Sequence, residues 1–461
     1  MARVAERLER ILEREAPTAG IRPVPPGRRT LSGLDLAVLW GDLSVGLLVM
    51  VTGALLVPAL GLRAALLAIV VGSVIGCVPL ALVALAGERE RVPTMVLLRP
   101  VLGERGSFLP SALNVIQLVG WTAVEFWAMG EVANVASVRL LDLDARGAWV
   151  AVMAVVCTGL ALGGPVLVVR RWLERFGIYV LLATAVWITV EVVRAGDVGA
   201  LWDRPGVGGL PFWLAVDLVI VMPVSWLPLA ADYNRFARAG GGAAVGTYAG
   251  YLVGTVWFYA LGVLLALGGA GAGAVGIGSA VVAVAGGGLV LLALLVGESD
   301  NAFADIYSAA VSTQNVAPNV SQRGLVVVVG AIAFVLALAF TMESYELFLL
   351  LIGSVFVPLF GVFAAHYFVV RGGRYGEAEI FAPTGVRWAA LVPWAAGFAV
   401  FHWSVATGPA AWTDAVRTVI ADWLSLPFPL LGGRLGASLP SFLVAFALAL
   451  VLVRDRGRPR G

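Results

Sequence analysis

The sequence predicts an all-α polytopic membrane protein with about twelve transmembrane helices. Hydrophobic residues make up 60% of the 461 residues and charged residues 13%, and the mean hydropathy is +0.94. This composition is more apolar than a soluble domain of this size needs to fill its core. Apolar runs of roughly 18 to 25 residues, the length that a helix needs to cross about 30 Å of hydrocarbon, recur along the chain. The first of these runs carries glycines around Asp42 and Ser44, and the sixth is broken by Pro223 and Pro228.

The predicted spans follow one another with short polar connections. The first six lie near 34–58, 62–86, 107–137, 147–169, 173–193 and 211–229. The other six lie near 244–268, 283–316, 324–341, 345–370, 387–406 and 437–453. The interrupted spans are the first and the sixth, which are five apart. This spacing predicts a five-plus-five inverted repeat, in which two five-helix units have opposite topology, followed by two C-terminal helices.

The arginine distribution predicts the orientation of the chain. We expect a tail at 1–33, a ten-helix core at 34–370, two additional spans at 371–453 and a second tail at 454–461. All 31 basic residues are arginine. With the N-terminus inside, 24 of them lie on the cytoplasmic side and 7 outside, as the positive-inside rule requires. Both termini are therefore expected in the cytoplasm, and the protein in the cell membrane.

The composition gives little support to other functional classes. A net charge of +2 is too small to suggest nucleic-acid binding. Cys77 and Cys157 lie in apolar runs without CxxC spacing, and His366 and His402 are isolated, so a metal-dependent enzyme would lack ligands. The charged N-terminal stretch RVAERLERILERE precedes no short apolar core, so we expect no cleavable signal peptide. Membrane lipid is the expected surrounding, and no obligate protein partner is evident.

Both interrupted spans carry an acidic residue. In the first span, WGDLSVGLLVMVTGALLVP, Asp42 lies beside two glycines, which let a helix unwind or approach another closely. In the sixth, PFWLAVDLVIVMPVSWLPLAADYNRF, Asp217 precedes Met222 and the helix-breaking Pro223 and Pro228. A carboxylate in hydrocarbon is costly, and carbonyls freed by a proline need protein, water or an ion beside them. We therefore expect a binding site inside the membrane, with Asp42, Asp217 and Met222 as candidate substrate contacts.

The third span carries a polar face. Asn114, Gln117, Trp121 and Glu125 are three or four residues apart in SALNVIQLVGWTAVEFWAMGEVAN, so they line one side of a helix. An aromatic ring one turn from a carboxylate suits a planar heteroaromatic ligand, because the ring stacks on the ligand while the acid accepts hydrogen bonds from its N–H groups. Gln117, Trp121 and Glu125 are the substrate contacts that this face predicts.

The eighth span is the most polar. Its sequence VGESDNAFADIYSAAVSTQN carries carboxylates and hydroxyls, the oxygen ligands that hard cations prefer. Glu298 and Asp305 are seven residues apart and share a face, whereas Asp300 points about 140° away from Asp305. The helix is therefore expected to serve two neighbouring sites. Glu298 lies nearer the expected end of the span, and its sequence position fits an interfacial residue as well as a site residue.

With these residues in view, the chain resembles the nucleobase-cation symporter-1 family, and within it the hydroxymethylpyrimidine transporters. The similarity runs from about Leu34 to Phe368. Its densest pieces are TGALLVP at 52–58, ALNVIQLVGWTAV at 112–124, DLVIVMPVSWLPLAADYNRF at 217–236, DIYSAAVS at 305–312 and LLLIGSVFVPLFGVFAAHYF at 349–368. The family fold is a five-plus-five inverted repeat with broken first and sixth helices, as the spans predict.

The resemblance implies roles for individual residues. It implies that Trp121 stacks on the substrate and that Glu125 hydrogen-bonds it, where hydantoin-type relatives have Gln. It implies a further substrate contact at Asp305, where those relatives have Asn. The family's sodium site pairs first-helix carbonyls with two adjacent hydroxyls of the eighth helix, which would fall on Ser299 and Asp300. Asp300 departs from that hydroxyl pair, so the coupling ion is left open between Na⁺ and H⁺.

The acids at 125 and 305 favour a donor-rich ligand. An aminopyrimidine such as hydroxymethylpyrimidine or cytosine fits them better than uracil or a hydantoin, whose faces offer carbonyl acceptors. The leading hypothesis is therefore secondary active uptake of a pyrimidine or related nucleobase, as in uptake of a thiamine precursor, coupled to Na⁺ or H⁺. One alternative keeps the fold but carries an amino acid or a quaternary amine, which the Trp121 ring would hold by a cation–π contact. The other alternative is a membrane enzyme or channel that uses the buried acids.

Overall fold

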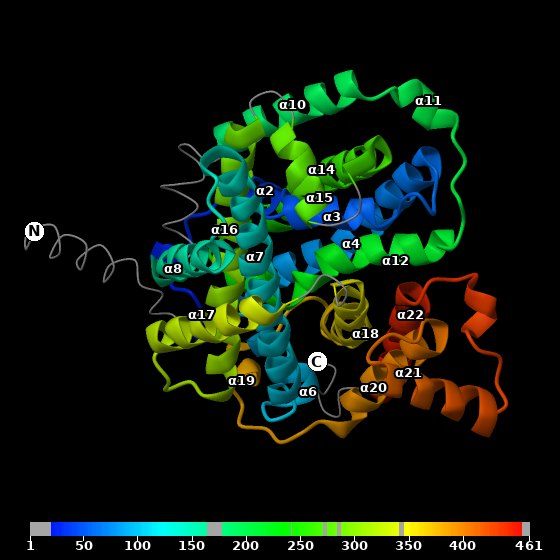
Figure 1. The fold of residues 1–461 in the computed structure, drawn as a ribbon. Coiled ribbons are helices and arrows are strands. Elements are labelled where there is room, and N and C mark those ends of the chain that lie inside the picture. The colour runs from blue at the N-terminus through cyan, green and yellow to red at the C-terminus, as the bar shows by residue number, and fades with distance from the viewer. Residues whose placement is uncertain are drawn as a thin grey trace, which may run out of the picture.

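The computed structural model describes residues 20–163, 178–240, 242–270, 274–283, 287–340 and 345–453. The charged stretch before residue 20 and the tail at 454–461 therefore lie outside the described residues, as do parts of the predicted fourth, fifth, eighth and ninth spans. Most of the described residues lie in helices, and the one β-bridge found among them joins Leu31 to Ala237. The fold is all-α (Figure 1).

The first half of the chain forms the helices that surround the first and third spans. Its longer helices are α2 (Gly33–Asp42), α3 (Leu47–Ala54), α4 (Leu62–Glu90), α7 (Phe108–Leu141), α8 (Arg146–Gly163), α10 (Ile178–Ala195) and α12 (Phe212–Ser225). Its short elements are η1 (Pro26–Arg28), α5 (Thr94–Leu97), α6 (Arg99–Leu102), α11 (Val198–Asp203), η3 (Leu227–Leu229) and α13 (Ala230–Asn234).

The second half of the chain runs from α14 to the terminal pair α20 and α22. Its longer helices are α14 (Ala243–Leu265), α15 (Ala274–Ala283), α16 (Gly287–Val316), α17 (Gln322–Ala339), α18 (Tyr345–Ala364), α20 (Trp388–Ser404) and α22 (Ser438–Leu452). Its short elements are η4 (Ala266–Ala270), η6 (Ala365–Val370), α19 (Glu377–Ile380), α21 (Ala410–Arg417), η7 (Thr418–Trp423) and η8 (Leu430–Gly433). Within the described residues, each predicted range overlaps one of the long helices or the α2–α3 pair.

Length and hydropathy together single out a subset of these helices as membrane spans. Six of the described helices are long and apolar enough to cross a membrane, or seven when the bent pair α2 and α3 is taken as one span. The arrangement is that of a multi-pass membrane protein.

The first span is interrupted where the sequence predicts it. Helices α2 and α3 meet at an angle of 59°. Gly46, the residue before α3, has an extended backbone. Helix α14 packs along both halves, and its glycines allow a close approach: a Cβ at Gly262 or Gly254 would collide with Met50 or Ser44. The bend leaves the backbone around residues 43–46 unwound beside α16.

The sixth span is interrupted less sharply than the sequence predicts. Helix α12 continues through Pro223 and ends at Ser225, and a 3₁₀ turn containing Pro228 leads into α13. The Ser225 hydroxyl donates to the carbonyl of Met222 at 2.7 Å, and Gln117 of α7 donates to the carbonyl of Ser225 at 3.0 Å. These bonds satisfy carbonyls of the last turn of α12, where the helical hydrogen-bond pattern stops.

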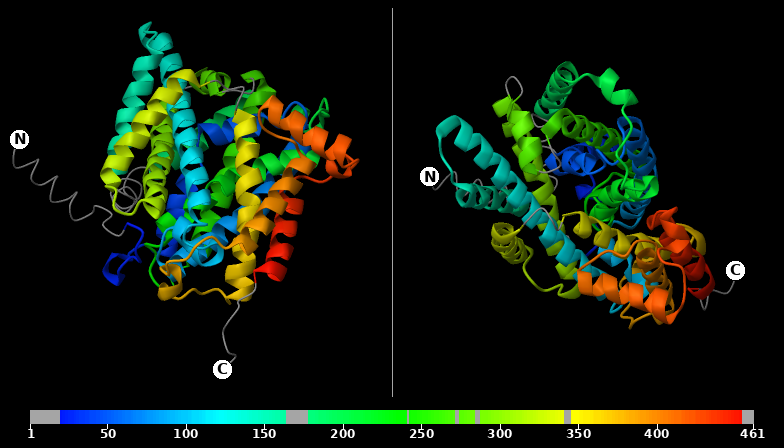
Figure 2. Two further views of the ribbon diagram at one scale, coloured as in Figure 1. Left: turned by 90° about the horizontal axis from the view of Figure 1, so that it is seen from below. Right: turned by 45° about the vertical axis from the view of Figure 1, so that its right-hand side comes forward.

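The terminal helices α20 and α22 lie at one edge of the molecule. They pack against each other and against α18, away from α2 and α16 (Figures 1 and 2). Trp394 of α20 donates to the carbonyl of Val355 in α18 at 2.8 Å, and Ser441 of α22 donates to the carbonyl of Gly397 in α20 at 2.8 Å. The pair therefore supports α18 from outside the repeat.

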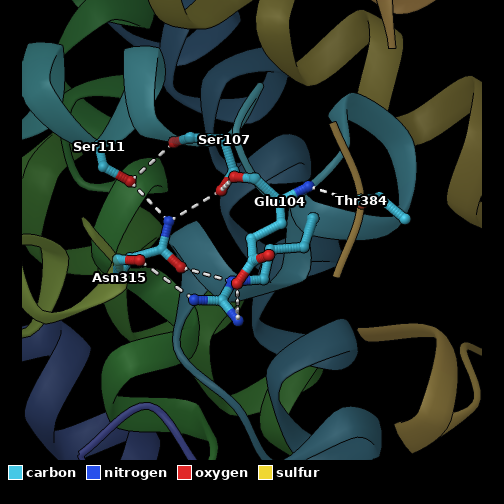
Figure 3. A network of polar contacts seen from close by, with 6 residues as sticks. Glu104, Ser107, Ser111, Asn315 and Thr384 are labelled. Atoms are coloured by element: carbon cyan, nitrogen blue, oxygen red, sulfur yellow. Dashed lines mark hydrogen bonds and ion pairs between the residues drawn. The ribbon is translucent and has the colours of Figure 1, made fainter. Parts of the chain in front are cut away.

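A buried polar network ties the end of α16 to the segment that leads into α7 (Figure 3). Arg99 Nε donates to Asn315 Oδ1 at 2.8 Å, and Asn315 Nδ2 donates to the hydroxyls of Ser107 and Ser111, both at 2.9 Å. Burial lowers the pKa of Arg99, and Glu104, 3.7 Å from its guanidinium, opposes that shift. The network fixes α7 against α16, the two helices that carry most of the candidate site.

Candidate functional site

A small pocket lies in the middle of the molecule between α3, α7, α12 and α16. It is lined by Leu43, Leu48, Val49, Trp121, Glu125, Met222, Ser225, Trp226, Asn301 and Asp305. Four of the predicted substrate contacts therefore meet around one space: Trp121, Glu125, Met222 and Asp305. Both interrupted spans contribute residues to the walls of the pocket. This is the expected position for unwound backbone at membrane depth, which has to face protein or a cavity.

The α7 wall presents an aromatic ring and an acid one turn apart. The ring of Trp121 is held by Tyr345 and Phe348 of α18, with centroid separations of 6.0 and 5.2 Å in edge-type contacts. Tyr345 in turn donates to the Leu48 carbonyl at 3.2 Å, so α18 links the ring to α3. The Trp121 Nε1 and Glu125 Oε2 atoms are buried with no hydrogen-bond partner among the described residues. These groups are available to a ligand.

The α16 wall faces them with Asn301 and Asp305, one turn apart. Both side chains are buried, and the Asn301 Oδ1 atom has no hydrogen-bond partner in the described chain. The carboxyl groups of Glu125 and Asp305 are close enough across the pocket to interact electrostatically. Two acids in one apolar space stay there only with protons or with a partner that supplies donors. The pocket therefore suits a ligand that is rich in N–H groups.

Gln117 acts beside the pocket and does not line it. Its amide nitrogen donates to Asn114 Oδ1 at 2.8 Å and to the Ser225 carbonyl at 3.0 Å. Asn114 in turn donates to the hydroxyl of Ser312 in α16 at 2.8 Å. Gln117 thus positions the end of α12, while its own Oε1 atom is buried with no partner among the described residues.

A second acidic pair lies at the bend of the first span. Asp42 ends α2, and its carboxyl group faces that of Asp300 closely enough for the two to share a hydrogen bond when one is protonated. Both side chains are about 3% exposed. Asp42 therefore lies with the candidate cation residue Asp300 and outside the pocket lining.

Ser299 points away from that pair. Its hydroxyl donates to the Leu295 carbonyl within α16 at 2.8 Å and lies 3.8 Å from the sulfur of Met129 in α7. In this structure the Ser299 hydroxyl makes these contacts, whereas the carboxyl group of Asp300 faces Asp42. The oxygen atoms that meet at the bend come from the carboxyl groups of Asp42 and Asp300. Such a set can hold a proton or a hard cation.

Asp217 is not brought to the pocket. Its carboxylate accepts hydrogen bonds from the backbone N–H groups of Ala437, at 2.5 Å, and Ser438, at 3.1 Å. These residues begin α22, so Asp217 caps the N-terminus of a terminal helix, where a negative charge is favourable. The assignment of Asp217 as a substrate contact is therefore not supported by its position. Its buried carboxylate instead binds the backbone of Ala437, 220 residues away in the sequence.

This position predicts that Asp217 affects stability and not binding. Asp217→Asn should lower the free energy of unfolding by about 1 kcal/mol, because an amide can accept only one of the two hydrogen bonds without facing a donor. Thermal unfolding of the purified protein measures the loss, and substrate binding by the same variant should match wild type. A variant with unchanged melting temperature and lost binding would return Asp217 to the site.

The sequence reasoning missed several residues at the site. Ser225, Trp226 and Asn301 line the pocket. Trp226 lies between the two prolines of the sixth span, and Asn301 lies in the polar run of the eighth, so the signals were present. Glu298 is fully inside, with 1% of its surface exposed, and contacts the start of α3. Its position near the expected end of the span gave no indication of this contact.

Comparison with known proteins decides the family. A protein-family sequence model, described as permease for cytosine/purines, uracil, thiamine and allantoin, matches residues 23–422. The chain belongs to the nucleobase-cation symporter-1 family. A cytosine permease of Escherichia coli is 28% identical over 359 residues, which cover 76% of this chain and 81% of the relative. The related proteins are permeases, and this protein is accordingly a transporter and not an enzyme.

Solved structures establish the fold. A nucleobase-cation-symport-1 family transporter in a closed conformation with bromovinylhydantoin bound superposes with a TM-score of 0.79 and 18% identity, covering 94% of each chain. A Na⁺-coupled sialic acid symporter superposes with a TM-score of 0.66 and 12% identity, covering 96% of this chain and 93% of that one. The expected fold, an inverted-repeat transporter with interrupted helices, is confirmed.

Proposed function

We propose that this protein is a symporter that imports a pyrimidine or related nucleobase, and that its substrate is an aminopyrimidine such as hydroxymethylpyrimidine or cytosine. The observation that carries the proposal is the pocket in which Trp121 and Glu125 of α7 face Asp305 of α16. A planar base stacks on the indole ring, and its amino and ring N–H groups donate to the two carboxyl groups.

The number of acceptors favours an aminopyrimidine over other bases. Glu125 Oε2 and Asn301 Oδ1 are buried acceptors that have no partner in the described part of the chain. Uracil and hydantoin present a carbonyl oxygen on each side of N3–H and one beside N1–H, and these oxygens would face the carboxylates. The exocyclic amine of cytosine or hydroxymethylpyrimidine supplies two donors at one edge. A site built for donors rejects an analogue that lacks them.

The coupling cation, Na⁺ or H⁺, belongs at the Asp42 and Asp300 pair in this proposal. The pair lies at the bend between α2 and α3, and α3 lines the pocket through Leu48 and Val49. A cation that neutralises the pair stabilises one arrangement of the bend and so favours the state in which the pocket is complete. Ser299 contributes to this cation site only when its hydroxyl gives up the hydrogen bond to the Leu295 carbonyl.

Alternating access then moves the base inward across the cell membrane. Both termini lie in the cytoplasm in this proposal, as the arginine distribution indicates. The terminal helices α20 and α22 lie outside the ten-helix core, whose two five-helix units rock around the pocket.

Uptake by proteoliposomes tests the proposed function. Purified protein is reconstituted, and accumulation of labelled hydroxymethylpyrimidine and cytosine is followed under an imposed Na⁺ gradient, an imposed proton gradient, or neither. The proposal expects accumulation of an aminopyrimidine under one of the two gradients, and weak competition by unlabelled uracil and hydantoin. Accumulation of neither base under any gradient, or stronger competition by uracil, would refute the proposed substrate.

A further inference from the structure

Glu298 is a residue of α16, and its carboxylate lies at the N-terminus of α3, the helix that follows the bend in the first span. Its Oε1 atom accepts a hydrogen bond from the backbone N–H of Leu48 at 3.2 Å, and its Oε2 atom accepts one from Asn301 Nδ2 at 3.3 Å. Leu48 and Asn301 both line the substrate pocket. Gly46 is the residue before α3, and a Cβ there would lie 3.1 Å from the Glu298 carboxyl carbon, so the chain leaves room for this acid.

A half-helix N-terminus inside a transporter is a binding place for anions. Its unpaired N–H groups and its dipole favour negative charge, and interrupted transporter helices direct such ends at anionic groups of their substrates. In this chain the end of α3 is already filled by an internal carboxylate. The N–H of Leu48 is therefore already hydrogen-bonded to Glu298, and an anionic group of a ligand at this place would lie beside the negative charge of Glu298.

The rest of the pocket offers an anion no compensation. None of the lining residues found in the described chain is Lys, Arg or His, whereas Glu125 and Asp305 are acids. Like charges brought together in a space without water repel each other by several kcal/mol. A ligand carboxylate at the end of α3 would therefore meet the negative charge of Glu298, and no basic side chain among the lining residues found in the described chain would compensate it.

We propose that Glu298 is a charge-selectivity residue that excludes carboxylate-bearing ligands from the pocket. The substrate is then neutral or cationic, whatever its ring system. This inference rests on the same pocket as the proposed function and narrows its substrate class: it admits aminopyrimidines and simple amines, and it rejects pyrimidine carboxylates, amino acids and betaines. Glu298 acts through the end of α3 and through Asn301, both of which it holds in place.

Two matched pairs of probes test the inference. Hydroxymethylpyrimidine is compared with the pyrimidine in which a carboxylate replaces the hydroxymethyl group, and choline is compared with betaine, which carries a carboxylate in place of the alcohol. Binding of each to purified wild-type protein is measured by calorimetry. The inference expects the alcohol of whichever pair binds to be favoured over the acid by roughly 100-fold, the equivalent of about 2.8 kcal/mol.

The variant Glu298→Gln carries the second half of the test. Glutamine keeps an acceptor for the Leu48 N–H but removes the charge, so the preference within the pair should fall to about tenfold or less. Glu346→Gln, which changes an exposed acid at the start of α18, is the matched control and should keep the wild-type preference. The unliganded melting temperature of each variant identifies any that fails to fold.

The outcomes separate this inference from the proposed function. Binding of choline but not of betaine or any pyrimidine would support charge selection and refute the pyrimidine substrate. Equal binding of hydroxymethylpyrimidine and its carboxylate by wild type would refute charge selection and leave the pyrimidine substrate standing. An unchanged preference in folded Glu298→Gln would also overturn the role of Glu298. The comparison of alcohol and acid in wild type remains decisive even when no variant folds.

Discussion

Glu125→Gln should reduce aminopyrimidine uptake by about 10- to 100-fold, and Glu125→Ala should abolish it. The carboxylate is buried, lines the pocket and has an oxygen atom with no partner among the described residues. A hydrogen bond to a charged group contributes about 1.5 to 3 kcal/mol, and the amide also places donors against the donors of the base. Uptake of labelled base by cells or proteoliposomes measures the effect.

The control for this prediction lies on the same helix. Glu131 is partly exposed at the far end of α7 and pairs with Arg146 at 2.5 Å, so Glu131→Gln should leave uptake within about twofold of wild type. Protein levels in the membrane are compared for all three variants. Wild-type uptake by a well-expressed Glu125→Ala variant would remove Glu125 from the substrate site.

Asp300→Asn should uncouple transport from the driving ion while leaving substrate exchange largely intact. The asparagine side chain can still hydrogen-bond Asp42, but it can neither carry the proton nor neutralise a cation as the carboxyl group does. We expect concentrative uptake under an ion gradient to fall by about tenfold or more. Exchange of internal for external labelled base, which needs no gradient, should change far less because Asp300 does not line the pocket.

The coupling ion follows from the same experiment. If the driving gradient in wild type is a proton gradient, Asp300→Asn removes its effect; if it is a Na⁺ gradient, the same variant removes the dependence of binding on Na⁺. Asp414→Asn, at an exposed position of α21, is the control. Full accumulation by Asp300→Asn under the driving gradient would refute the assignment of the pair as the coupling site.

Local sequence patterns predicted the parts of the site that lie on single helices. Trp121 and Glu125 share a face because they are four residues apart, and the separation of Asp300 from Asp305 follows from the helical repeat. The bend of the first span was visible in its glycines. In each case the geometry within one helix determines the relation between the residues, so the sequence contains the information.

The parts that the sequence did not reveal depend on contacts between distant segments. Asp217 has the same local signature as a site residue, an acid in an apolar span, but its partners begin α22. Glu298 faces α3 because of how α16 packs beside the bend, and 250 residues separate it from Leu48. The prolines of the sixth span suggested a sharper break than the structure has: α12 continues through Pro223 to Ser225, whose carbonyl accepts a hydrogen bond from Gln117 of α7. Only the packing of helices against one another distinguishes these cases.

The most direct test of the central claim is calorimetric binding of hydroxymethylpyrimidine, cytosine, uracil and hydantoin to the purified protein, with Na⁺ and without it. The account predicts that an aminopyrimidine binds most tightly, that Trp121→Ala and Glu125→Gln weaken that binding, and that Asp217→Asn does not. Tighter binding of uracil or hydantoin than of either aminopyrimidine, or undiminished aminopyrimidine binding by both pocket variants, would contradict it.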